Sequence, residues 1–161
     1  MKTLVPAPEA QALTNLLLTM FRANNLTIAW GDRIVSPLGL TSARWQILGA
    51  IALADRPQPV AWLARDLGAN RQNVQRIVND LMGEELVTFE PNPHHKRAQL
   101  VVLTSKGRQT YEAALRLYNP LVAALAEGMP AEDIQVAQRV LSALWAKLEE
   151  FTIEDARLIR D

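Results

Sequence analysis

A run of polar side chains between residues 71 and 79 has the chemistry needed to read nucleic-acid bases. Arginine donates paired hydrogen bonds to guanine, and asparagine or glutamine pairs in the same way with adenine. Six such residues share one face of a predicted helix: Arg71, Gln72, Asn73, Gln75, Arg76 and Asn79. The alternative is an ordinary solvated face, although exposed helices more often carry Glu and Lys pairs.

The opposite face of this segment is apolar, at Val74, Ile77, Val78, Leu81 and Met82. This spacing predicts a helix from Arg71 to Gly83 with one buried stripe and with Asn70 as its N-cap. A shorter helix over residues 60–68, ended by Gly68 in a left-handed cap, comes just before it. Two helices joined by a tight turn make a helix-turn-helix pattern, which also occurs in helical proteins that do not bind DNA.

A basic hairpin is predicted directly after this pattern. Residues 86–90 (LVTFE) and 98–104 (AQLVVLT) have strand composition, and residues 91–97 (PNPHHKR) form the turn. Lys96 and Arg97 at its tip suit contacts to phosphate and insertion into a narrow minor groove. The alternative is a solvated hairpin tip without a partner. Residues 56–59 (RPQP) are predicted to form a turn.

Long amphipathic helices flank this region on both sides. One runs from residue 9 to about 34, and a second begins at Thr41 as N-cap, with buried candidates at Trp45, Ile47, Leu48 and Ile51. A helix from Thr104 contains Pro120, where we expect a bend. The last helix carries a narrow apolar seam at Ile134, Ala137, Leu141, Leu144, Leu148 and Phe151. The first helix and the last two are the expected dimer interface, with packing inside the monomer as the competing explanation for part of the seam.

Composition restricts the classes of function. The 161 residues are about half apolar, which predicts one soluble domain, expected in the cytoplasm without a membrane span. The net charge is zero, but residues 61–108 carry seven Lys and Arg against five Asp and Glu. There is no cysteine, and the adjacent His94 and His95 lack spaced metal-ligand partners. We therefore expect no metal, no cofactor and no enzyme activity.

Three segments of the chain resemble the MarR family of bacterial transcriptional regulators: LTSARWQILGAI, VAWLARDLGANRQNVQRIVNDLMGEELV and PNPHHKRAQLVVLTSKG. Arg97 matches the family's minor-groove arginine. Leu103, Thr104 and Gly107 match its Leu-Thr-x-x-Gly signature. His95 stands where the family usually has Asp.

The resemblance implies a mainly α fold with a small β-hairpin wing, an α+β winged helix-turn-helix. It implies a single domain over residues 1–161, with a DNA-binding lobe at 41–104 and dimerisation helices at 9–35 and 105–161. The homodimer would bind a pseudo-palindromic double-stranded DNA operator, as a repressor released by a small aromatic, anionic ligand. The predicted DNA-binding residues are Arg65, Asn70, Arg71, Gln72, Asn73, Gln75, Arg76, His95, Lys96 and Arg97. The predicted ligand-binding residues are Trp30, Arg33, Arg44, Trp45 and Tyr111.

A protein-interaction module that kept the winged fold and lost DNA binding is the alternative function, because the neutral overall charge is unusual for a nucleic-acid binder.

Overall fold

The computed structural model describes residues 7–95 and 97–150. The chain divides into two compact units, Met1–Pro120 and Leu121–Asp161, which we describe separately. The fold class predicted from the sequence is confirmed, since most of the described residues are helical and a small antiparallel sheet completes the first unit.

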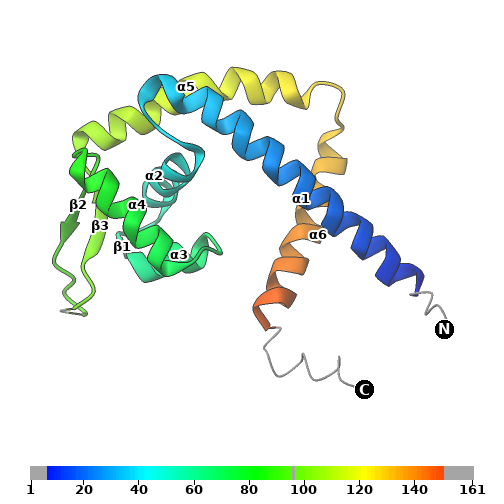
Figure 1. Ribbon diagram of the computed structural model, residues 1–161, viewed down its shortest axis with the longest axis horizontal. Coiled ribbons are helices and arrows are strands. Elements are labelled where there is room, and N and C mark those ends of the chain that lie inside the picture. The colour runs from blue at the N-terminus through cyan, green and yellow to red at the C-terminus, as the bar shows by residue number, and fades with distance from the viewer. Residues whose placement is uncertain (1–6, 96, 151–161) are drawn as a thin grey trace. The chain divides into compact units, whose positions relative to one another are not determined.

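The first unit contains the helix-turn-helix and the helices that precede and follow it in the chain (Figure 1). They are α1 (Pro8–Val35), the 3-10 helix η1 (Ser36–Leu38), α2 (Ser42–Leu53), α3 (Val60–Asp66), α4 (Arg71–Gly83) and the first part of α5 (Ser105–Ala126). Gly39, with φ of 70°, ends η1 in the left-handed region, where a side chain would be strained. Thr41 caps α2 as predicted, because its hydroxyl accepts a hydrogen bond from the amide of Arg44 at 3.3 Å.

The sheet contains three strands where the sequence predicted two. They are β1 (Gln58–Pro59), β2 (Val87–Glu90) and β3 (Leu100–Leu103), in the antiparallel order β1-β3-β2. The predicted turn at residues 56–59 is therefore wrong in part, because Gln58 pairs with Val101 on the open edge of β3. Proline is tolerated in such an edge strand, where no neighbour requires its missing N–H. The strand predicted over residues 98–104 is also shorter than expected.

The core of the first unit lies between α2, α3, α4 and the sheet. Its fully buried side chains include Ile47, Leu48, Leu63, Val74, Val78, Leu81, Val87 and Val101. Met82, predicted to be buried, is 43% exposed. At about 100° per residue it lies about 80° around the helix from Val74, beyond the edge of the buried stripe.

The end of α1 is joined to the start of α2 by polar contacts. The hydroxyl of Ser42, a buried residue, donates to the carbonyl of Ile28 at 2.8 Å. A carboxylate oxygen of Asp32 accepts from the amide of Ser42 at 2.6 Å and so satisfies a free N–H in the first turn of α2. A Cβ at Gly31 would lie 2.5 Å from the Ser42 hydroxyl oxygen, so the two helices cross where one has no side chain.

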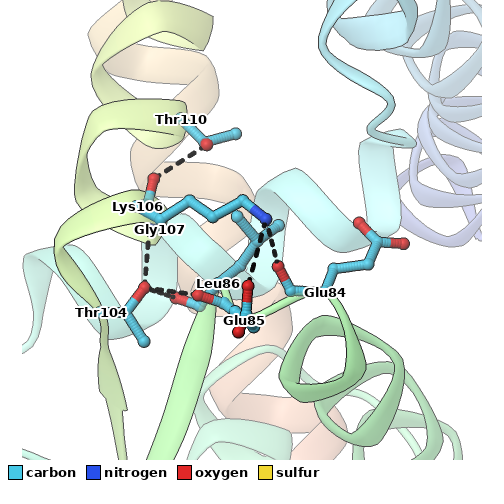
Figure 2. A network of polar contacts seen from close by, with 7 residues as sticks. All are labelled: Glu84, Glu85, Leu86, Thr104, Lys106, Gly107 and Thr110. Carbon is cyan, nitrogen blue, oxygen red and sulfur yellow. Dashed lines mark hydrogen bonds and ion pairs between the residues drawn. The ribbon is translucent and has the colours of Figure 1, made fainter.

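A second polar junction joins the end of α4 to the start of α5 (Figure 2). The hydroxyl of Thr104 donates to the carbonyl of Glu85 at 2.6 Å and accepts from the amide of Gly107 at 2.9 Å. The Lys106 ammonium donates to the carbonyl of Glu84 at 2.8 Å. A Cβ at Gly107 would overlap the carbonyl oxygen of Leu86, so the backbones meet there without room for a side chain.

The backbone turns into this junction at Glu85, whose φ is 61°. A non-glycine residue in the left-handed region costs about 1 kcal/mol or more, so the surrounding contacts must hold it there. The amide of Leu86 donates to the carbonyl of Leu81 at 2.9 Å, which closes the end of α4.

The second unit contains the last six residues of α5, 121–126, and the helix α6 (Ala131–Glu150). Most of the apolar residues predicted to form the seam are exposed, including Ile134, Leu141 and Leu148. Phe151, the last of them, lies outside the described residues. Helix α5 continues through Pro120, and the predicted bend there stays a prediction. Over the residues that the structure describes, no helix is long and apolar enough to cross a membrane.

Replacing Gly107 with Ala should destabilise the first unit by about 3 kcal/mol, because the new methyl group meets a backbone oxygen that cannot move aside. Urea unfolding followed by circular dichroism measures this loss. The matched control is Gly83→Ala, where a Cβ meets nothing within 4 Å and the helix should gain about 0.5–1 kcal/mol. Equal effects of the two substitutions would contradict the close approach of the backbones at Gly107.

Candidate nucleic-acid interface

The turn between α3 and α4 is fixed by local backbone chemistry. Gly68 adopts a φ of 59°, as predicted for a left-handed cap, and the amide of Ala69 donates to the carbonyl of Ala64 at 2.8 Å. Asn70 is the N-cap of α4, since its side-chain oxygen accepts from the amides of Gln72 at 2.8 Å and Asn73 at 3.4 Å. This cap fixes the point at which α4 begins and the conformation of its first helical turn.

The polar face of α4 is open to solvent. Arg71, Gln72, Asn73, Arg76 and Asn79 are exposed, and Gln75 is partly buried. Side chains on this face are linked in pairs: Arg76 donates to Asn73 at 3.0 Å, and Gln75 donates to Asn79 at 3.0 Å. These exposed hydrogen bonds are exchangeable with hydrogen bonds to another partner at small net cost.

The hairpin between β2 and β3 is organised by Asn92, which the sequence analysis did not single out. Its side-chain amide donates to the carbonyl of Ala98 at 2.9 Å, and its side-chain oxygen accepts from the amide of His94 at 3.0 Å. An asparagine between two prolines is a turn signal that the sequence offered. Arg97 is exposed in this hairpin, and Lys96 lies outside the described residues.

The hairpin and the start of α4 border a common recess of about 460 Å³. Four of the predicted DNA-binding residues line it, namely Arg71, Gln75, His95 and Arg97. The remaining lining residues come from β1, α3, β2 and the hairpin, and none is acidic. Segments far apart in the sequence therefore present cationic and amide groups to one place.

Arg65, also predicted to bind DNA, lies on α3 and does not line this recess. Its guanidinium is 3.6 Å from the carboxylate of Asp66 and 5.6 Å from the ring centroid of Trp62. Gln72, Asn73 and Arg76 also lie outside the recess, on the exposed face of α4.

Three of the five predicted ligand-binding residues are aromatic and pack on the core of the first unit. Trp30 and Trp45 both make edge-to-face contacts with Tyr118, with centroids 5.7 Å and 5.0 Å apart. Tyr111 lies against Gly49 of α2. Tyr118, at the centre of this cluster, was missing from the predicted ligand set, although it stands on the same helical stripe as Tyr111.

The two predicted arginines of the ligand set have different surroundings. Arg44 forms an ion pair with Glu84 and donates to the carbonyl of Gly39 at 3.0 Å, which joins α2 to the end of α4. Its Nε is buried without a hydrogen-bond partner among the described residues. Arg33 is exposed in the last turn of α1.

Comparison with known proteins agrees with this geometry. A model of the MarR family matches residues 38–98, from the end of η1 into the hairpin. An uncharacterized protein of Mycobacterium tuberculosis is 37% identical over 101 residues, which cover 63% of this chain and 69% of that protein. The chain belongs to the MarR family.

Two further comparisons extend this assignment. The transcriptional activatory protein BadR of Rhodopseudomonas palustris is 30% identical over 109 residues, 65% of this chain and 61% of that protein. The crystal structure of Sco5413, a MarR family transcriptional regulator of Streptomyces coelicolor, matches with a TM-score of 0.70 and 26% identity. The match covers 91% of this chain and 99% of that one. The chain therefore has the fold of a MarR family transcription regulator, in which β2 and β3 form the wing.

Replacing Asn70 with Ala should lower the free energy of unfolding by about 1 kcal/mol, because two amides at the start of α4 lose their acceptor. Asn70→Asp should retain the stability, since a carboxylate also caps and favours the helix N-terminus. Urea unfolding of both variants measures the difference. Asn79→Ala, on the exposed face of the same helix, is the control and should change stability little. If Asn70→Ala and Asn79→Ala had the same free energy of unfolding, the side chain of Asn70 would not be what stabilises the start of α4.

Proposed function

We propose that this MarR family protein is a homodimeric, sequence-specific DNA-binding transcription regulator without enzymatic activity. The observation that carries the proposal is the recess in which α4 and the wing bring Arg71, Gln75, His95 and Arg97 together. A helix-turn-helix enters the major groove with the N-terminal part of its second helix, and an adjacent wing reaches the neighbouring minor groove. In this assignment α4 reads bases and Arg97 occupies the minor groove.

The first two turns of α4 carry the base-reading side chains. Gln72, Asn73 and Arg76 are exposed there and offer the donor and acceptor pairs that distinguish adenine and guanine in the major groove. Because the oxygen of Asn70 is occupied by the cap, its role toward DNA is to orient this turn, with only its amide group left to contact a phosphate.

A homodimer is supported by apolar side chains that the chain leaves exposed in each unit. Helix α1 exposes Leu13, Leu18, Phe21, Leu26 and Ile28, and helix α6 exposes Ile134, Val136, Val140, Leu141, Trp145 and Leu148. Exposed apolar residues at this density mark an association surface. Two-fold symmetry would place the two α4 helices about one turn of DNA apart, on a pseudo-palindromic operator.

We also propose that the regulator acts as a repressor and that a small aromatic, anionic ligand releases it. The aromatic cluster of Trp30, Trp45 and Tyr118 supports the aromatic part of this proposal, and the unpartnered Nε of Arg44 supports the anionic part. The relative BadR is named as an activatory protein, so likeness to it does not favour repression over activation. Transcription in vitro from a promoter that overlaps the operator decides it.

The Arg97→Ala variant tests the assignment of the wing. Duplexes selected from a random pool by the wild-type protein supply the operator, and fluorescence anisotropy at several salt concentrations measures affinity. The variant should lose about 1–3 kcal/mol of binding free energy, show a shallower salt dependence and lose the preference for A·T-rich flanks. Arg108→Ala removes an exposed arginine of α5 that does not line the recess, and it should bind like the wild type.

Unchanged binding of Arg97→Ala to the selected duplex would overturn the wing assignment. Failure of the wild-type protein to enrich any sequence would instead favour the protein-interaction module.

The Leu141→Glu variant tests the dimer. Leu141 is 40% exposed, so a charge there should leave the fold of the chain intact and disrupt the apolar association surface. Sedimentation equilibrium should show a monomer, with DNA affinity lowered at least tenfold because one lobe alone binds half of the operator. Gln135→Glu adds the same charge at an exposed polar position of α6 and should remain dimeric. A dimer of Leu141→Glu with wild-type affinity would exclude α6 from the interface.

A further inference from the structure

Arg76, on the polar face of α4, has a side-chain contact on each side of it along the helix. Its Nη2 donates to the side-chain oxygen of Asn73 at 3.0 Å, and its Nη1 lies 3.5 Å from a carboxylate oxygen of Asp80. Asn73 precedes Arg76 by three positions and Asp80 follows it by four, the two spacings at which side chains meet on a helix surface. The guanidinium is therefore held from both directions.

These contacts leave Arg76 able to bind a further partner. Its side chain is 68% exposed. A guanidinium carries five N–H groups, and the hydrogen bond to Asn73 uses only one of them. A guanine presents N7 and O6 in the major groove and takes two donors of an arginine. Arg76 can therefore pair with a guanine while Asn73 and Asp80 still hold it.

The amide side chains of this face differ in what they have free. To pair with adenine, an amide accepts through its oxygen and donates through its nitrogen at the same time. The oxygen of Asn73 is turned toward Arg76, and the oxygen of Asn79 accepts from the nitrogen of Gln75 at 3.0 Å. The side chain of Gln72 makes no hydrogen bond with the described residues, so both ends of its amide are free.

We propose that Asn73 and Asp80 are positioning residues that hold the Arg76 guanidinium for contact with a guanine, and that Gln72 is the amide that pairs with an adenine. Gln72 lies one turn before Arg76 on the same side of α4, so the two side chains meet neighbouring base pairs of each half-site. The inference rests on the proposed function, because it assigns the bases that α4 contacts.

The expected size of the effect follows from the strength of exposed helix contacts. Each such contact favours the held conformation by about a factor of two. The apparent dissociation constant of a complex that needs this conformation varies inversely with its population, so loss of Asp80 should weaken contact with the guanine about twofold in each half-site. Where the guanine is replaced, loss of Asp80 should not weaken binding, because removal of an acidic side chain also lowers the repulsion of phosphates.

The position of the guanidinium is tested on the protein without DNA. Nitrogen-15 relaxation of the arginine Nε–H signals measures the order of each guanidinium, and Arg76→Lys assigns the signal of Arg76. We expect a higher order parameter for Arg76 than for Arg71, which is exposed on the same helix and forms no ion pair among the described residues. Asp80→Ala should lower the order parameter of Arg76 to that of Arg71, and Asp80→Glu should retain it. Asp55→Ala, which removes an exposed carboxylate outside α4, is the matched control and should not change it.

Specificity is measured by fluorescence anisotropy on duplexes that the wild-type protein selects from a random pool. A second selection with Arg76→Ala identifies the G·C pair whose preference is lost, and replacement of this pair in both half-sites gives the discrimination. Asp80→Ala should lower the discrimination about fourfold over the two half-sites, Asp80→Glu should retain it and Asp55→Ala should leave it unchanged. In the Arg76→Ala background, Asp80→Ala should have no effect on discrimination, since Asp80 acts through Arg76.

Two further variants separate the roles of the amides. Asn73→Ala should lower discrimination at the base pair of Arg76, whereas Gln72→Ala should lower it at a neighbouring A·T pair. Equal order of Arg76 and Arg71 in the wild-type protein, full discrimination by Asp80→Ala, or loss of an adenine preference in Asn73→Ala would each overturn the proposal. Failure of the wild-type protein to enrich any sequence would contradict the proposed function, and the order parameter of Arg76 would still decide whether Asn73 and Asp80 hold it.

Discussion

The close approach of Gly107 to the carbonyl of Leu86 is the constraint on which the winged helix-turn-helix depends. At this point the end of α4, the start of β2, the end of β3 and the start of α5 meet, and the backbones leave no room for a side chain. The Thr104 hydroxyl serves both partners of the junction, as donor to Glu85 and as acceptor from Gly107. Since α4 ends here and the first strand of the wing begins here, the position of the wing relative to α4 is set by contacts of the backbone, two of them with the Thr104 hydroxyl.

Helix α4 is held at its N-terminal end by a different set of contacts. Asn70 satisfies two amides of the first turn, while Gly68 supplies the left-handed residue that lets α3 and α4 meet at an angle. Between these ends the buried stripe of α4 packs on the core, where a change of one methylene is felt. The polar face therefore lies on a rigid helix. Because the backbone of this helix is ordered during folding, binding of a partner does not add the entropy cost of ordering it.

Local patterns predicted the local features well. These features are the apolar period of residues 74–81, the N-caps Thr41 and Asn70 and the cap glycine Gly68, and each depends on neighbours within one or two turns. The strand β1 was missed because two residues have no detectable period, and their pairing partner lies more than 40 positions away. For the same reason the sequence offered the predicted DNA-binding residues of the recess and did not show which segments share it. Its lining comes from residues 59–62, 71, 75, 89, 95 and 97–99. The contacts of the Arg56 and Arg65 guanidinium groups with the ring of Trp62 were also not predicted.

Zero net charge is compatible with a DNA-binding surface because the acidic residues near α4 have specific partners. Glu84 pairs with Arg44, Asp80 lies 3.5 Å from Arg76, and the Glu85 carboxylate lies 3.9 Å from the Lys106 ammonium. Over the described residues, by contrast, Arg71 and Arg97 form no ion pair. At physiological ionic strength a charge acts over about 8 Å, so a phosphate at the recess responds to these two arginines and not to the total charge of the chain.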